Sequence, residues 1–195
     1  MSPREAEFLE FVAADPDLAA IVAAMRTFGA PDCWLVSGAL FQTVWNVLDG
    51  RPQGYGVLDY DLFYFDEDAS EAAEARWIET TAVHFAFAKR EVQLRNQARV
   101  HLWYRDKFGA PEYPRLRSSC DGVRHFLMTA CMVAIRPQSN GTLELFAPVG
   151  VDDVFERILR PNPLWPHAPR KAYLEKAARY MRDWPSLKNI AEGTR

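Results

Sequence analysis

The chain has 195 residues, of which 49% are hydrophobic, and its formal net charge is −3. This length fits one domain that can bury a substantial core without a metal or a disulfide. The mild acidity argues against a surface that wraps nucleic acid by charge alone. No apolar run approaches the roughly 18 residues of a membrane span, the N-terminal segment is too acidic for a secretory signal, and the three cysteines lack the CxxC spacing of zinc sites. We therefore expect a cytoplasmic protein with no membrane partner.

Charge is unevenly distributed along the chain. Residues 59–80 hold eight acidic residues and one arginine, whereas residues 89–124 hold nine basic and four acidic residues. These blocks are either two solvated faces or the two halves of a site that holds metal cations and phosphates together.

In the first half of the chain, two amphipathic helices are expected over residues 4–13 and 17–28, with a break before Pro16, because the residue that precedes a proline avoids helical geometry. Residues 33–36 are typical of a buried strand, and the Ser-Gly-Ala sequence at 37–39 leads into a helix that ends near residue 48. After a loop rich in Pro and Gly, residues 58–66 have the composition of a strand. A helix over 70–87 follows, with Ser70 as its N-cap.

In the second half, a strand is expected over 90–94 that continues near 100–103, followed by a loop over 105–117 and a helix over 118–127. Residues 130–135 and 142–146 form a hairpin around an Asn-Gly turn. A helix capped by Asp152 or Asp153 runs to residue 159. We expect one domain over 1–163, and over 164–195 a proline-rich connector and a basic amphipathic helix (170–184) packed on that domain.

Asp59 and Asp61 are the candidate centre of the chemistry. On a strand, residues i and i+2 point the same way, which places their Cβ atoms roughly 6–7 Å apart. Two carboxylates at that spacing repel one another unless a cation lies between them. Mg²⁺ takes one or two protein carboxylates and completes its shell with waters and phosphates. The alternative is a solvent-facing strand, against which Phe63 and Phe65 argue because they share the same face.

The order of these features is similar to that in the DNA polymerase β-like nucleotidyltransferase superfamily: a strand, the Ser-Gly-Ala turn, a helix, a loop and the D-x-D strand. Within it, residues 38–46, 59–66, 96–104 and 147–153 resemble the bacterial nucleotidyltransferase family protein group, and the resemblance covers about residues 33–163. It implies an α/β (α+β) fold with a minimal nucleotidyltransferase core, in which a mixed sheet is flanked by helices.

The resemblance also implies an activity, which is the Mg²⁺-dependent transfer of a nucleotidyl group from an NTP to the hydroxyl of an unknown acceptor (a small molecule, RNA or protein). Asp59 and Asp61 would hold Mg²⁺ and act in catalysis. Ser37, Gly38 and Ala39 would let the triphosphate approach the helix N-terminus, where free N–H groups attract anions.

A third carboxylate is expected from the neighbouring strand, as the base for the attacking hydroxyl. The position that aligns with it is Gln93, which cannot act as a base and is grouped with the nucleotide-binding candidates. Glu91 is the candidate replacement on the same strand face. If neither serves, the chain is a degenerate nucleotide-binding or regulatory module without turnover.

Asn96, Arg99 and His101 complete the nucleotide-binding candidates. The amide of Asn96 suits a base edge, Arg99 suits a bidentate phosphate contact, and His101 suits a phosphate contact or an acid. The alternative is a bulge whose side chains satisfy nearby backbone groups. For two further groups a structural role is expected. Four residues are expected in the core rather than in a platform that stacks on a base (Trp45, Asn46, Trp103, Tyr104). Five basic residues of the C-terminal helix are expected on a solvated face, although they could also contact RNA or phosphate (Arg170, Lys171, Lys176, Arg179, Arg182).

Overall fold

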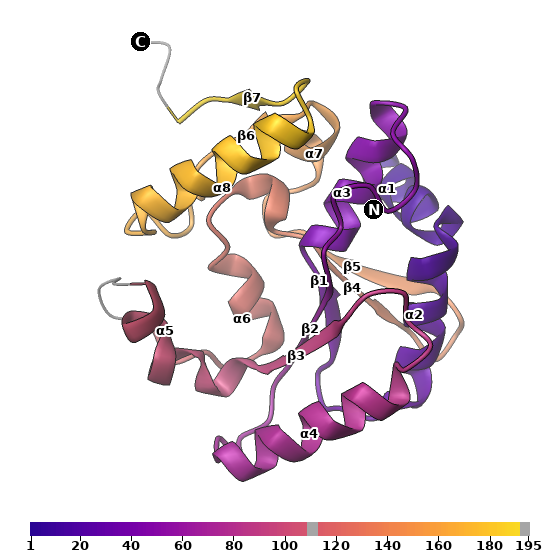
Figure 1. The fold of residues 1–195 in the computed structure, drawn as a ribbon, viewed down its shortest axis with the longest axis vertical. Coiled ribbons are helices and arrows are strands. Elements are labelled where there is room, and N and C mark those ends of the chain that lie inside the picture. The colour runs from indigo at the N-terminus through magenta and orange to yellow at the C-terminus, as the bar shows by residue number, and fades with distance from the viewer. Residues whose placement is uncertain (109–112, 192–195) are drawn as a thin grey trace.

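A computed structural model describes residues 1–108 and 113–191 of the chain. Its centre is a five-stranded sheet in the order β3-β2-β1-β4-β5, formed by β1 (Trp34–Val36), β2 (Tyr60–Tyr64), β3 (Val92–Asn96), β4 (Ala134–Pro137) and β5 (Leu143–Phe146). The sheet is mixed, because β2 runs antiparallel to β1 and parallel to β3. The predicted mixed sheet is therefore confirmed (Figure 1).

Eight α-helices surround this sheet in the described part of the chain. They are α1 (Pro3–Ala14), α2 (Pro16–Phe28), α3 (Gly38–Leu48), α4 (Glu71–His84), α5 (Val100–Phe108), α6 (Ser119–Arg124), α7 (Asp152–Phe155) and α8 (Arg170–Asp183). Two short strands, β6 (Ile158–Leu159) and β7 (Lys188–Asn189), form a separate parallel pair. None of the described helices is both long and apolar enough to cross a membrane.

Local capping signals explain where several helices begin. Ser2 and Glu5 form a capping box at the start of α1, and Asp15 accepts hydrogen bonds from two amides in the first turn of α2. The predicted N-cap of α4 is confirmed, because the Ser70 side chain accepts from the amide of Ala73. These short side chains satisfy amides that have no partner within the helix.

The strand predicted near residues 100–103 was wrong. After β3, the side chain of Asn96 accepts from the amide of Ala98 at 3.0 Å, which begins a 3₁₀ turn over Gln97–Arg99 that leads directly into α5. The predicted loop over 105–117 was wrong for residues 105–108, which belong to α5, and residues 109–112 lie outside the described residues.

The helix predicted to reach residue 159 ends at Phe155. Arg157 has a φ of 57°, which a right-handed helix cannot contain, and β6 follows. The predicted side-chain cap is also wrong, because Val151 stands at the N-cap position. Asp153 instead accepts a hydrogen bond from the Thr129 hydroxyl at 2.6 Å and pairs with Arg160.

The two faces of β2 differ, and this difference positions the site. Tyr60, Leu62 and Tyr64 are buried in the main core, whereas Phe63 points to the opposite face and packs on a smaller cluster near α6. Asp61 shares the face of Phe63, because alternate residues of a strand point the same way.

Helix α8 packs its apolar side against α3. Tyr173, Ala177 and Tyr180 are buried, and the ring of Tyr180 lies 5.5 Å from that of Trp45 on α3. Just after α8, the indole of Trp184 donates to Asn46 at 2.9 Å. These contacts hold α8 against α3.

Candidate functional site

A cavity of about 160 Å³ lies between β2, the N-terminus of α3 and the inner side of α8. Asp59 and Asp61 contribute its acidic wall. The other lining residues come from the turn before α3, from α3, from the approach to β2 and from α8: Ser37, Gly38, Ala39, Gln42, Leu58, Lys176, Arg179 and Tyr180. The structure thus brings together five of the residues that the sequence assigned to the catalytic and nucleotide-binding site (Ser37, Gly38, Ala39, Asp59, Asp61).

Strand pairing fixes the position of Asp61 within this cavity. It lies opposite Val36 of β1 on one side and opposite Gln93 of β3 on the other, whereas Asp59 lies just before the strand begins. Burial and, to a smaller extent, the neighbouring charge of Asp59 raise the pKa of Asp61 from 3.8 to about 6. Burial and the second carboxylate therefore both disfavour the ionised form of Asp61.

This pair fits a hard divalent cation. Within residues 1–108 and 113–191, no three His, Cys, Asp or Glu side chains gather closely enough to hold a metal ion. A cation on Asp59 and Asp61 would need waters or substrate phosphates as its remaining ligands. That is the usual coordination of Mg²⁺ in enzymes that act on nucleotides.

The turn before α3 shapes the opposite wall. Ser37 has a φ of 56° and a ψ of −114°, a strained conformation for a residue with a side chain, and its amide donates to the carbonyl of Val133 at 2.9 Å. The turn places the N-terminus of α3 at the cavity. Helix N-termini attract anions through their free amides and the helix dipole. The Oε1 of Gln42, a residue that is only 5% exposed, lines the same cavity and has no hydrogen-bond partner in the described part of the chain.

Gly38 leaves open space at this helix N-terminus. A Cβ built on Gly38 would meet only the Gln42 Nε2 atom, at 3.6 Å, which is an ordinary contact. The protein itself therefore does not require glycine here. The absence of a side chain instead allows close approach of a ligand to the backbone.

Glu91 and Gln93 adjoin the acidic wall from β3. The Gln93 amide nitrogen donates to Asp59 Oδ2 and to Glu91 Oε2, both at 3.2 Å. Glu91 is exposed and connects to the site through this amide. Gln93 therefore links the two carboxylates, and Glu91 stands beside the pair.

Comparison with known proteins identifies the family of this chain. The sequence model of the nucleotidyltransferase family matches residues 23–189. The chain belongs to the nucleotidyltransferase family. A solved NMR structure, described as revealing a CCA-adding enzyme head domain, has the same fold, with a TM-score of 0.79 at 23% identity over 94% of both chains. No match was found among the curated proteins.

The resemblance stated from sequence is thus confirmed, and it covers more of the chain than residues 33–163. The family match extends through α8. This helix supplies the two cavity cations that sequence reasoning left on a solvated face, Lys176 and Arg179. Within the described residues neither side chain forms an ion pair, and the Arg179 guanidinium lies 5.0 Å from the ring centre of Tyr180. Their basic character was visible in the sequence, but their position depends on how α8 packs.

Asn96 and Arg99 lie away from the small cavity. The amide of Asn96 accepts from the Asp66 and Ala98 backbone and donates to the Asp66 carbonyl, which is the structural alternative considered for it. The Arg99 guanidinium contacts the Ala69 carbonyl and pairs with Glu74 at 2.8 Å. Both residues fasten β3 to the N-terminal region of α4.

His101 also lies apart, on α5. Burial lowers its pKa, and the positive charge of Arg115 lowers it further. It lines neither the small cavity nor the larger pocket next to it.

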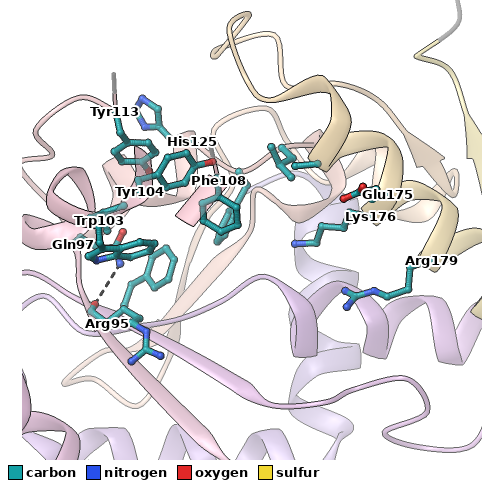
Figure 2. Close-up of a pocket in the computed structure, with 16 residues that line it drawn as sticks. Arg95, Gln97, Trp103, Tyr104, Phe108, Tyr113, His125, Glu175, Lys176 and Arg179 are labelled. Atoms are coloured by element: carbon teal, nitrogen blue, oxygen red, sulfur yellow. Dashed lines mark hydrogen bonds between the residues drawn. The ribbon is translucent and has the colours of Figure 1, made fainter. Parts of the chain in front are cut away.

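That larger pocket, of about 570 Å³, has an aromatic wall that includes Trp103 and Tyr104, two residues expected in the core. Trp45 and Asn46, expected there as well, are buried as predicted. Figure 2 shows the aromatic side chains of α5, together with Tyr113 and His125, on one side of this pocket and the charged side chains of α8 on the other.

Proposed function

We propose that this chain transfers a nucleotidyl group from an NTP to an acceptor hydroxyl, with Mg²⁺ held by Asp59 and Asp61. One observation carries the proposal: the two aspartates lie in the same small cavity as the N-terminus of α3 and two cations of α8 that form no ion pair with a described residue. Negative groups for a metal and positive groups for phosphates are what a bound Mg²⁺–NTP requires.

Each wall of the cavity has a separate role in this proposal. Mg²⁺ would neutralise charge on the triphosphate and on the leaving pyrophosphate. The amides of Gly38 and Ala39, together with Lys176 and Arg179, bind the phosphates. Because these groups occupy fixed positions on helices, they can stabilise developing charge with little reorganisation.

The transfer step is a displacement at the α-phosphorus. The acceptor oxygen forms a bond to this phosphorus, while the bond between the α-phosphorus and the oxygen that bridges to the β-phosphate breaks, and pyrophosphate leaves. Glu91 accepts the proton of the attacking hydroxyl. Gln93 positions Glu91 relative to Asp59 through its two hydrogen bonds.

The test is incubation of the full chain with each α-³²P-labelled NTP and MgCl₂, in the presence of small-molecule and RNA fractions from bacterial cells. We expect label transfer and pyrophosphate release that EDTA abolishes. Asp61→Asn should lose both signals. Asp152→Asn is the matched control, because Asp152 is 71% exposed and lies on α7. Full activity of Asp61→Asn would exclude the assigned site.

A second candidate is a module that binds NTP without turnover. The observation that favours it is Gln93, which lies opposite Asp61 at the position where a third carboxylate is expected. This candidate predicts that Mg²⁺–NTP raises the melting temperature while no pyrophosphate is released. Pyrophosphate release that depends on Asp61 excludes it.

A further inference from the structure

The 570 Å³ pocket has a wall rich in aromatic side chains. The ring centres of Tyr104 and Tyr113 lie 4.2 Å apart, and those of Tyr113 and His125 lie 5.2 Å apart. The ring of Trp165 packs against this group, with its centre 5.8 Å from that of Tyr104. The volume falls in the range of small-molecule sites, and mutually packed rings form a preorganised surface for a flat ligand.

The pocket continues directly from the candidate active site. On β2, Asp61 lines the small cavity and Phe63, two residues further along the same strand face, lines the large pocket. Lys176 and Arg179 of α8 line both spaces. A ligand in the aromatic pocket would therefore lie next to the metal-binding carboxylates.

Sheet order places this pocket on the side from which an acceptor would attack. The strands run β3-β2-β1, and the proposed phosphate site at α3 follows β1. The pocket is lined instead by Arg95 of β3 and by Gln97 just after it. In a phosphoryl displacement the attacking and leaving oxygens are roughly in line on opposite sides of the phosphorus. Pyrophosphate leaving on the β1 side thus implies an acceptor on the β3 side.

Charge specifies the acceptor further. Arg95, Lys176 and Arg179 line the pocket, and none of them forms an ion pair with a residue that the structure describes, whereas Glu175 is the acidic residue among the lining side chains. Figure 2 shows Lys176 and Arg179 extending from α8 on the side opposite the aromatic wall. A ligand with one aromatic end and one anionic end satisfies both sides.

We propose that this pocket binds the acceptor, and that the acceptor is a small planar aromatic molecule carrying an anionic group and the hydroxyl that is modified. This inference rests on the proposed function for the identity of the reaction. The hydroxyl oxygen bonds to the α-phosphorus of the NTP, the bond to the pyrophosphate oxygen breaks, and the hydroxyl proton passes to Glu91.

The test measures binding without NTP or Mg²⁺, so its result does not depend on turnover. The probe is 3-hydroxy-2-naphthoate, a fluorescent two-ring compound with a hydroxyl and a carboxylate, and 2-naphthol is the uncharged comparison. Ala172→Trp fills the pocket from α8, where Ala172 lines it. Ala178→Trp is the matched control, because Ala178 is exposed on the same helix.

We expect Ala172→Trp to raise the Kd of the naphthoate at least tenfold and Ala178→Trp to leave it within twofold of the wild-type value, with unchanged circular dichroism in both. Arg179→Gln, on the α8 side of the pocket, should weaken binding of the naphthoate but not of 2-naphthol. Equal naphthoate binding by the wild-type chain and Ala172→Trp overturns the proposal. An RNA octamer that displaces the naphthoate at tenfold lower concentration overturns it in favour of an RNA acceptor. If the wild-type chain binds the naphthoate as expected but turns over no NTP, the proposed function is wrong and the proposed pocket stands.

Discussion

Gln93 and Asp61 lie opposite each other on the parallel strands β3 and β2, and the Gln93 amide donates to both Asp59 and Glu91. A carboxylate at position 93 would add a negative charge next to three others. The neutral amide instead holds two carboxylates in place through hydrogen bonds. In the proposed mechanism this leaves the proton-accepting role to Glu91, so substitutions of Glu91 and of the aspartate pair test the mechanism directly.

Asp61→Asn should stabilise the metal-free protein at neutral pH. Since the pKa of Asp61 is raised from 3.8 to about 6 by burial and by Asp59, the folded state binds its proton more tightly than the unfolded state. Ionisation therefore lowers the free energy of unfolding as the pH rises from about 4 to about 6. At pH 7 in EDTA, we expect a gain on the order of 1–2 kcal/mol, or several degrees in Tm.

The measurement is denaturant unfolding of the wild-type chain and Asp61→Asn between pH 4 and pH 8. The two proteins should converge in stability near pH 4, where Asp61 is protonated in the folded state. Equal stability at pH 7 would show that Asp61 carries no such penalty.

Glu91→Gln should lower kcat by about 10²-fold or more, because a positioned general base contributes rate enhancements of that order. The Kd for Mg²⁺–NTP should stay within about twofold of the wild-type value, since Glu91 is bonded to Gln93 and is not one of the proposed phosphate ligands. Glu79→Gln is the control, because Glu79 is exposed on α4. Single-turnover kinetics together with equilibrium binding separate the two effects, and an unchanged kcat would remove Glu91 from the mechanism.

Gly38→Ala should weaken NTP binding at least tenfold while the fold remains intact. The added methyl group meets only Gln42 Nε2 at 3.6 Å within the protein, so its main effect is to fill space at the N-terminus of α3. Alanine also favours a helix over glycine by up to about 1 kcal/mol, so the melting temperature should not fall. Isothermal titration with each NTP tests this. Wild-type affinity of Gly38→Ala for NTP would show that the phosphates do not bind at the N-terminus of α3.

Local patterns predicted the parts of this fold that local chemistry determines. The period of two in β2 placed Asp61 and Phe63 on one face, and Ser70 marked the start of α4. In contrast, the sequence predicted a strand near 100–103 and a loop from 105, where the structure has α5, because the turn that begins this helix depends on the Asn96 side chain accepting a hydrogen bond from the amide of Ala98. Such a bond has no hydrophobic period to reveal it.

The missed site residues depend on contacts between distant parts of the chain. Lys176 and Arg179 reach the cavity because α8 is docked on α3, with Trp184 bonded to Asn46 across 138 positions in sequence. The basic face was readable from the sequence, but the docking that turns part of it inward was not.

Arg99 shows the reverse case, in which an expected phosphate contact is occupied by a structural partner. Its side chain is 10% exposed and pairs at 2.8 Å with Glu74, which is 15% exposed. Removing one member of a buried pair leaves the other charge uncompensated, at a cost of roughly 3–5 kcal/mol. We therefore expect Arg99→Ala to lower the free energy of unfolding by about 3 kcal/mol and to leave the Kd for NTP unchanged.

Urea unfolding measures the change in stability, and nucleotide titration at a temperature where the variant is folded measures the Kd. Arg105→Ala, at an exposed position on α5, should change neither. If Arg99→Ala instead lost NTP affinity at wild-type stability, Arg99 would be a substrate ligand, and the active site would have to extend from the small cavity to the N-terminal region of α4.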